Sequence, residues 1–318
     1  MARRAPTIVA VALNPAIDRV LEVPGLAIGR HQRGRLVSIQ PAGKAVNVAR
    51  FLGALGAQCI LTGFVGQAER HHFESSFEKT PVRVEMFDAR GPTRENITLV
   101  DPDAGAETHV RDVGNPLSEE DLERLSRKLA ILGTKGAYVV FAGSLTPGME
   151  ADAFAILLKR CVTKGAMVAV DSSGPGLEAV ARTDGLWLAK PNRDELAELT
   201  GRPAGTEAEV RLGAEALRRR IENVVVTLGA EGAMLFWRQG AWRARPVVDP
   251  QAVLKTVGAG DALLAGFIHA HSTGQPIQEC LRQGVACGTA ATLQLRAGVV
   301  NPYDVKSCLE RVELTAMK

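Results

Sequence analysis

Aromatic side chains are scarce in this chain, and neither sign of charge is in large excess. Phe, Trp and Tyr make up 4% of the 318 residues, and 38 basic against 35 acidic residues leave a formal net charge of +3. Proteins that bind nucleic acids generally present a strongly basic face with aromatic residues. The composition therefore argues against a nucleic-acid partner.

Long hydrophobic runs are also missing. No stretch approaches the roughly 20 apolar residues that a membrane-spanning helix requires. Two arginines precede an apolar run near the N-terminus, but the run at 8–13 is short for the core of a signal peptide. We therefore expect a buried first strand, no membrane partner and a cytoplasmic location.

Paired cysteines are absent. The five cysteines are odd in number, widely scattered and never in a C-x-x-C arrangement, and no zinc-ligand spacing occurs. Such a pattern is typical of reduced core or surface thiols in a cytosolic protein. The adjacent His71 and His72 lie in a polar stretch, where surface positions are expected.

Several short apolar runs predict buried strands, in a chain that is 46% hydrophobic. Their apolar character is continuous and does not alternate, which favours a parallel sheet covered on both faces. Helical patterns lie between them, so the order indicates a doubly wound α/β fold. The predicted strands lie at 7–13, 58–64, 137–143, 166–173, 185–190 and 223–229, and the predicted helices at 43–56, 118–133, 193–201 and 206–221.

Two stretches break this rhythm, at about 18–40 and 93–114. Both alternate apolar and polar residues with period two and contain Gly and Pro turns, which predicts hairpins with one wet face. No linker separates them from the rest. We expect one domain over 1–318, with a small β-sheet lid formed by these two insertions.

The segment "TVGAGD" at 256–261 runs into an apolar helical pattern. Backbone amides at such a loop-to-helix junction, together with the helix dipole, stabilise anions. Asp261 is then placed to orient an acceptor hydroxyl and take its proton, or it merely caps the helix. The segment matches neither the Walker loop nor the G-x-G-x-x-G fingerprint, which excludes a dinucleotide-dependent dehydrogenase.

Three further residues suit a hydroxyl-rich ligand. Gly43 precedes a helix that carries Asn47 in its first turns, and Asn is otherwise a poor residue inside a helix. Asp18 follows a strand end and a Pro turn, where it can accept from two hydroxyls. Taken alone, Asp18 is equally explained as a loop carboxylate in water.

Two other segments suit a nucleotide and its metal ion. Asn192 and Glu195 are one helical turn apart, so their oxygens share an edge and suit Mg²⁺ bound through water; a surface helix start is the alternative. Gly229 and Gly232 form a turn after a buried strand, where a planar nucleotide fits beyond the strand's carboxyl end.

These motifs, in this order, resemble the ribokinase-like (pfkB) family of carbohydrate kinases over essentially the whole chain. The similarity is greatest to its hexose-phosphate branch, which holds 1-phosphofructokinase, tagatose-6-phosphate kinase and the minor 6-phosphofructokinase. The resemblance implies a three-layer α/β fold with a mostly parallel central sheet, helices on its faces and a small β-sheet lid. The motifs that carry it are "LNPAID", "AGKAVNVAR", "GPTRENITL", "AGSLTPGM", "DSSGPGL", "KPNRDEL", "VTLGAEGA" and "TVGAGD".

The resemblance also implies roles for individual residues. In the reacting centre these are Asp261 as catalytic base and the amides of Gly258, Ala259 and Gly260 as an anion hole. For the substrate they are Asp18, Gly43 and Asn47 at the sugar hydroxyls, Arg94 at the phosphate already present and Lys44 as a second phosphate contact. For the nucleotide they are Lys190, Asn192, Thr227, Gly229 and Gly232, with Asn192 and Glu195 organising Mg²⁺ through water.

The chain departs from the family pattern at a few positions. Ala42 and Ala45 stand where glycines are usual, and the methyl group of Ala45 lies beside the expected sugar site. In the second insertion, where the family often ends a strand with Asn or Arg facing the substrate, this chain offers Thr108, His109 and Arg111, which leaves the phosphate contact there open.

The function expected from the resemblance is an ATP- and Mg²⁺-dependent kinase that converts fructose 1-phosphate to fructose 1,6-bisphosphate. The alternatives are a tagatose-6-phosphate or fructose-6-phosphate kinase, a kinase of an unphosphorylated sugar or nucleoside, and a non-catalytic sugar-phosphate-binding regulator. A homodimer formed through the lid is implied as well.

Overall fold

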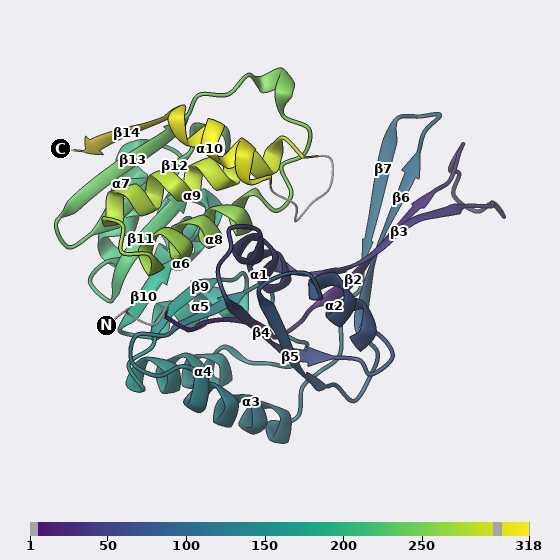
Figure 1. Ribbon diagram of the computed structural model, residues 1–318, viewed down its shortest axis with the longest axis horizontal. Coiled ribbons are helices and arrows are strands. Elements are labelled where there is room, and N and C mark those ends of the chain that lie inside the picture. The colour runs from purple at the N-terminus through teal and green to yellow at the C-terminus, as the bar shows by residue number, and fades with distance from the viewer. Residues whose placement is uncertain (1–5, 295–300, 318) are drawn as a thin grey trace.

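The computed structural model of the chain describes residues 6–294 and 301–317, and within them the strands form two separate sheets (Figure 1). The large sheet has ten strands. Their spatial order is β14 (Val312–Met317), β13 (Gly240–Pro246), β12 (Ala233–Trp237), β11 (Ile221–Thr227), β10 (Leu186–Ala189), β9 (Met167–Asp171), β8 (Tyr138–Ala142), β1 (Ile8–Ala12), β4 (Cys59–Val65) and β5 (Val82–Asp88).

The run from β11 to β5 is parallel throughout, whereas β12, β13 and β14 continue the sheet in antiparallel pairs. All six apolar runs predicted as strands lie in the parallel part. Their side chains are buried on both faces, which explains why these runs do not alternate with polar residues. The mostly parallel α/β fold expected from the sequence is thus confirmed.

Helices cover both faces of the large sheet and enclose two hydrophobic cores. Alternate β1 residues separate the cores, since Ile8 and Ala10 belong to one and Val9 and Val11 to the other. The first face carries α1 (Lys44–Ala54), α2 (Arg70–Phe77), α8 (Ala259–Ser272), α9 (Ile277–Thr292) and α10 (Pro302–Glu310). The second carries α3 (Glu119–Leu132), α4 (Ala151–Thr163), α5 (Pro175–Arg182), α6 (Arg193–Thr200) and α7 (Glu207–Leu217).

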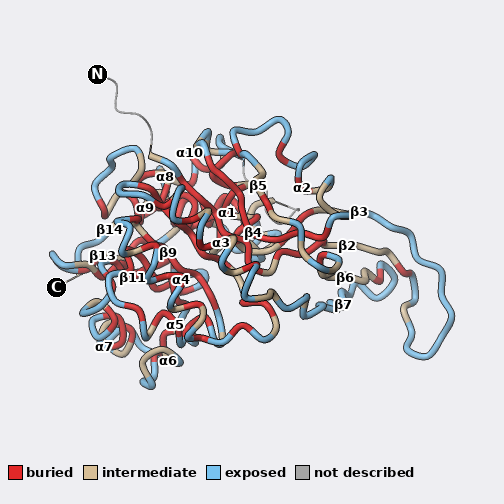
Figure 2. Tube along the Cα trace, turned by 90° about the horizontal axis from the view of Figure 1, so that it is seen from below, coloured by how far each residue is buried: buried red, intermediate tan, exposed pale blue. Residues whose placement is uncertain are grey.

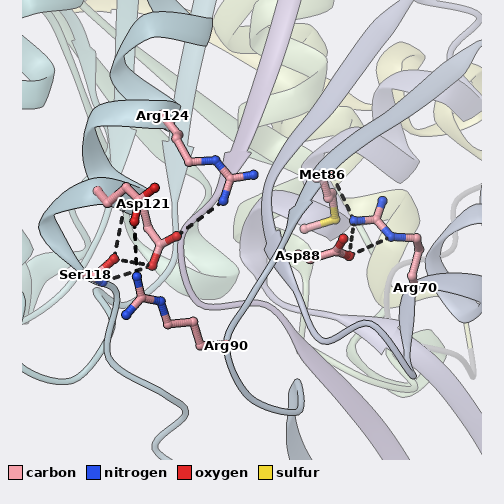
Figure 3. Close-up of polar contacts among 8 residues, drawn as sticks. Arg70, Met86, Asp88, Arg90, Ser118, Asp121 and Arg124 are labelled. Carbon is pink, nitrogen blue, oxygen red and sulfur yellow. Dashed lines mark hydrogen bonds and ion pairs between the residues drawn. The ribbon is translucent and has the colours of Figure 1, made fainter.

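Polar contacts fix the start of α3 and tie α2 to the large sheet, as Figure 3 shows. Ser118 and Asp121 bond each other's backbone amides in a capping box, and this explains why α3 begins where the sequence predicts. Arg124 lies 3.5 Å from Asp121. On α2, Arg70 forms an ion pair with Asp88 and so ties the helix to β5.

The composition of the core agrees with the sequence analysis. All five cysteines are free and buried, and burial raises the pKa of the Cys59 thiol to about 12. No helix in the described part of the chain is both long and apolar enough to cross a membrane.

The second sheet has four strands and projects away from the body (Figure 1). The strands come from the two stretches that the sequence predicts as hairpins, and much of their outer length is exposed (Figure 2). The two central strands are parallel to each other, and each outer pair is antiparallel. The spatial order is β3 (Arg35–Ala42), β2 (Ala16–Glu22), β6 (Arg94–Asp101) and β7 (Ala106–Arg111).

Asp101 anchors the outer end of this projecting sheet. The residue is 6% exposed, and its carboxylate accepts hydrogen bonds from the amides of Gly25 and Leu26 at 2.9 Å, Asp103 at 3.0 Å and Ala104 at 3.3 Å. One side chain therefore joins the loop after β2 to the turn between β6 and β7.

Replacing Asp101 by Ala should loosen this outer loop without unfolding the body. Without their acceptor, the amides of Gly25 and Leu26 should exchange hydrogen with solvent about tenfold faster or more. Residue-resolved hydrogen exchange measures this, and Asp103→Ala is the matched control because Asp103 contributes only its backbone amide to Asp101. Unchanged exchange at both amides would contradict the anchoring role.

Candidate active site

A cleft of about 1010 Å³ lies between the small sheet and the carboxyl edge of the parallel strands. The chain leaves β1 toward β4 on one side and later returns to β8 on the other side, so the strand order reverses between β1 and β8. Ligands of open α/β sheets bind in the crevice at such a reversal. Asn14 after β1, Ser144 after β8, Asp171 at the end of β9 and Lys190 after β10 all line this cleft.

The N-terminus of α8 presents unpaired amides to the cleft. Gly258 caps the helix with φ +89°, a left-handed conformation that favours glycine. Within the described residues, the amides of Gly258, Gly260 and Asp261 have no hydrogen-bond acceptor in the protein. The amide of Ala259, which the sequence predicts to join them, donates instead to the carbonyl of Thr256 at 3.2 Å. Three unpaired donors at the positive end of the helix suit an anion.

Asp261 is the third residue of α8 and is 5% exposed. Its carboxylate accepts from Asn47 Nδ2 at 2.8 Å and makes no capping bond, so the alternative role as a helix cap does not describe it. Burial and the charge of Asp171 raise the pKa of Asp261 to about 7, against the opposing effects of the Asn47 hydrogen bond, Lys44 and Lys190. Such a carboxyl group changes protonation near neutral pH.

Asp171 is a functional candidate that sequence reasoning missed. Its fully buried carboxylate lies 2.9 Å from Lys44 Nζ and 3.1 Å from Lys190 Nζ. Burial opposes its ionisation, but the two ammonium groups outweigh burial and lower the pKa of Asp171. The signal in the sequence was an acidic residue at the end of an apolar strand, where parallel strands place functional groups.

Gly260 leaves room for this ion-paired cluster. A Cβ atom at that position would lie 3.3 Å from Lys190 Nζ, so the absence of a side chain lets the ammonium group approach the start of α8.

The N-terminus of α1 faces the same cleft. Gly43 caps α1 at φ +112° and lines the cleft together with Lys44 and Asn47. Helices α1 and α8 pack against each other (Figure 1). Two helix N-termini therefore add positive potential to one space.

The small sheet contributes a polar wall. Asp18 on β2 accepts from Asn96 Nδ2 on β6 at 2.8 Å, a pairing that follows from the strand register. Sequence reasoning did not single out Asn96. Arg94 also lines the cleft, but its guanidinium donates to the carbonyls of Asn14, at 3.0 and 3.2 Å, and Asp112, at 3.1 Å.

The end of this wall is formed by β7. His109 and Arg111 line the cleft, whereas Thr108 is not among the described residues that do so. Ala42 and Ala45, at positions where the family usually has glycine, are buried at its edge.

Asn192 and Glu195 form the start of α6. Asn192 Oδ1 accepts from the Glu195 amide and Glu195 Oε2 accepts from the Asn192 amide, both at 2.8 Å. The alternative, that these two residues simply begin a surface helix, thus describes part of their role. Burial lowers the pKa of Lys44, but the charges of Asp171, Glu195 and Asp261 raise it above its ordinary value, so the Glu195 carboxylate acts on the cleft side.

The remaining nucleotide residues predicted from the sequence lie at the end of β11 or just beyond the ends of β10 and β11. Thr227 pairs with Asn192 in an isolated parallel bridge, and Gly229 and Gly232 form the turn into β12. These residues are not among those that line the 1010 Å³ cleft. The described residues contain no group of three or more His, Cys, Asp or Glu side chains that would hold a metal ion by themselves.

Comparison with known proteins agrees with this geometry. The chain is 32% identical to 1-phosphofructokinase of Vibrio cholerae over 312 residues, which cover 98% of this chain and 97% of that protein. It is 32% identical to 1-phosphofructokinase of Escherichia coli K12, with 99% of each chain covered.

A solved structure shows the same fold. Phosphofructokinase-2 from Escherichia coli, in complex with potassium, superposes with a TM-score of 0.90 at 26% identity, covering 96% of this chain and 99% of that one. Residues 7–303 match the pfkB family of carbohydrate kinases. Since the match spans nearly the whole chain and includes the cleft, the chain belongs to the pfkB family of carbohydrate kinases.

Proposed function

We propose that this protein transfers the γ-phosphoryl group of ATP to the 6-hydroxyl of fructose 1-phosphate, giving fructose 1,6-bisphosphate. The observation that carries the proposal is the buried Asp261, with a pKa of about 7, beside the unpaired amides of α8 on the wall of the cleft. The full-length similarity to 1-phosphofructokinases supports the choice of substrate.

The chemistry follows from the groups at the α8 N-terminus. Ionised Asp261 accepts a hydrogen bond from the acceptor hydroxyl and takes its proton as the oxygen bonds to phosphorus. The negative charge on the phosphoryl oxygens is met by the amides of Gly258 and Gly260 and by the ammonium groups of Lys44 and Lys190. Asp171 keeps both lysines in place.

The phosphate already on the substrate would bind at the small sheet. Arg94 has five N–H groups. Three bonds to main-chain carbonyls and one to Asn96 Oδ1 at 3.5 Å leave one N–H group for a phosphate oxygen. Asp18, Gly43 and Asn47, which also line the cleft, would hold the sugar hydroxyls. Arg111 and Lys255 supply further positive charge in the cleft.

The nucleotide would lie toward Lys190, Asn192, Thr227, Gly229 and Gly232. Mg²⁺ usually keeps several waters and binds few protein ligands besides the phosphates. The side-chain oxygens of Asn192 and Glu195 would suit such an ion, bound through water. When bound, the ion would neutralise charge on the phosphate oxygens.

The small sheet would act as a lid that excludes water from the γ-phosphoryl group. Its strands β3 and β7 expose apolar side chains, namely Leu36, Val37 and Val110. An apolar surface on a projecting sheet supports a homodimer formed through this sheet. For the proposed ATP-dependent kinase we also propose a cytoplasmic location.

A substrate panel tests the proposed reaction. Release of ADP should be fastest with fructose 1-phosphate and much slower with fructose 6-phosphate and tagatose 6-phosphate. Turnover of unphosphorylated sugars, or ligand binding without any turnover, would favour the other kinases or a regulator.

Asp261→Asn should lower turnover about 100-fold or more while leaving binding of the sugar phosphate nearly unchanged, because a general base acts on the chemical step.

Arg94→Ala tests the contact to the substrate's phosphate. The KM for fructose 1-phosphate should rise at least tenfold, because a guanidinium–phosphate contact contributes about 1.5–3 kcal/mol. Arg19→Ala is the matched control, since Arg19 is ion-paired with Glu95 on the same sheet and is not among the cleft-lining residues described. An unchanged KM for Arg94→Ala would point to an unphosphorylated substrate.

Asp171→Asn should impair both stability and activity. Breaking the buried ion pairs should lower the free energy of unfolding by roughly 3 kcal/mol, and kcat should fall about tenfold or more because the lysines lose their anchor. The acid limb of kcat/KM should move to lower pH, because the charge of Asp171 raises the pKa of Asp261.

Urea unfolding and pH–rate profiles measure these changes for Asp171→Asn. Asp152→Asn is the control, because Asp152 forms only an exposed ion pair with Arg182. An acid limb and kcat that match the unmodified protein would show that Asp171 does not act on Asp261 or the lysines.

A further inference from the structure

Arg50 lies one helical turn after Asn47 on α1 and contacts it through its guanidinium. Arg50 Nη1 donates to Asn47 Oδ1 at 3.1 Å, and Nη2 donates to the carbonyl of Pro41 on β3 at 2.8 Å. The guanidinium also lies over the ring of Phe77, 5.7 Å from its centroid. Arg50 thus joins α1, the small sheet and the residue that contacts Asp261.

These contacts determine which way the Asn47 amide points. A guanidinium has only donors, so the atom of Asn47 that faces Arg50 must be the oxygen. The NH₂ group then faces Asp261 and donates to Oδ2 at 2.8 Å. If the amide turned over, its NH₂ group would face the donors of Arg50 and its oxygen would face the carboxylate of Asp261.

The orientation matters because Asp261 has few other partners. In the described residues, Asn47 is the one side chain that hydrogen-bonds the Asp261 carboxylate. The charged groups that act on it are Lys44 from α1, Asp171 from β9 and Lys190 after β10. Burial and Asp171 favour the neutral carboxyl, so the Asn47 N–H is a main contribution to its ionised form.

We propose that Arg50 is a positioning residue for the catalytic base. Arg50 holds the Asn47 amide with its NH₂ group toward Asp261 and ties this amide to strand β3. The inference rests on the proposed role of Asp261 in phosphoryl transfer. Arg50 itself is not among the residues that line the cleft; it acts through Asn47.

Loss of Arg50 should therefore shift the pKa of Asp261 in one direction, upward. A freed Asn47 amide can turn its oxygen toward Asp261, and an acceptor beside a carboxyl group favours the protonated form. Asp261 then ionises only at higher pH. A purely structural role for Arg50 would lower activity or stability without moving this titration.

The kinetic test compares kcat/KM against pH for the unmodified protein, Arg50→Met, Arg50→Lys and Arg70→Met. The acid limb should move up by about one pH unit in Arg50→Met, which is a tenfold change in the ionisation constant. Arg50→Lys keeps the charge but not the paired donors, so the acid limb should move up in this variant as well. Arg70, an ion-paired arginine on α2 (Figure 3), is the control whose loss should leave the limb in place.

A substrate-free measurement separates this inference from the kinase assignment. The carboxyl ¹³C resonance of Asp261, assigned by its absence from Asp261→Asn, is followed by NMR against pH in the full chain. Its midpoint should rise in Arg50→Met but not further when Arg50→Met is added to Asn47→Ala, because the effect passes through that amide. If the unmodified protein showed no turnover, the proposed function would fail while this titration could still be read.

Two outcomes would overturn the positioning role. In the first, the acid limb of kcat/KM and the NMR midpoint of Asp261 are both unchanged in Arg50→Met. If the Met variant does not fold, the same result in Arg50→Lys counts instead. The other is a midpoint that returns to the unmodified value in Arg50→Lys, which would make the charge of Arg50, and not its hold on the amide, the cause.

Discussion

The hydrogen bond from Asn47 to Asp261 is the contact on which the proposed chemistry of the cleft depends. A carboxyl group as deeply buried as Asp261 would ordinarily stay protonated, and the neighbouring Asp171 adds to that tendency. The Asn47 N–H and the ammonium groups of Lys44 and Lys190 act in the opposite direction. The balance leaves a base that changes protonation near neutral pH, where a proton acceptor is most effective.

The fold makes this balance possible because it gathers residues that are far apart in the chain. The carboxyl ends of β9 and β10 bring Asp171 and Lys190 to one edge, and the packing of α1 against α8 sets Asn47 beside Asp261. Parallel strands with helices on both faces leave the strand ends free for this purpose. Stability comes from the two cores, so the edge can carry groups that do not stabilise the fold.

Sequence patterns predicted six of the seven parallel strands, because burial on both faces removes polar residues from them; the edge strand β5, which carries polar residues, was not predicted. The antiparallel β12, β13 and β14 were not predicted either; β13 and β14 are partly exposed and carry polar residues, which interrupt the apolar pattern. Asp261 stood out through its glycines, although sequence could not separate a base from a helix cap; in the folded chain its side chain is buried and makes no capping bond. Asp171 and Arg50 were missed because their importance lies in partners that only the tertiary structure supplies.

The same arrangement makes the active site a source of instability. The pKa of Asp261 rises from its ordinary value of 3.8 to about 7 in the folded chain, so the folded state holds a proton that the unfolded state has lost between these values. The free energy of unfolding therefore falls as pH rises through this window, by a total on the order of 4 kcal/mol. Any change that makes Asp261 easier to ionise relieves this penalty but also weakens the base. With Asp261 in its proposed role, the position of the Asn47 amide sets a compromise between folding and catalysis.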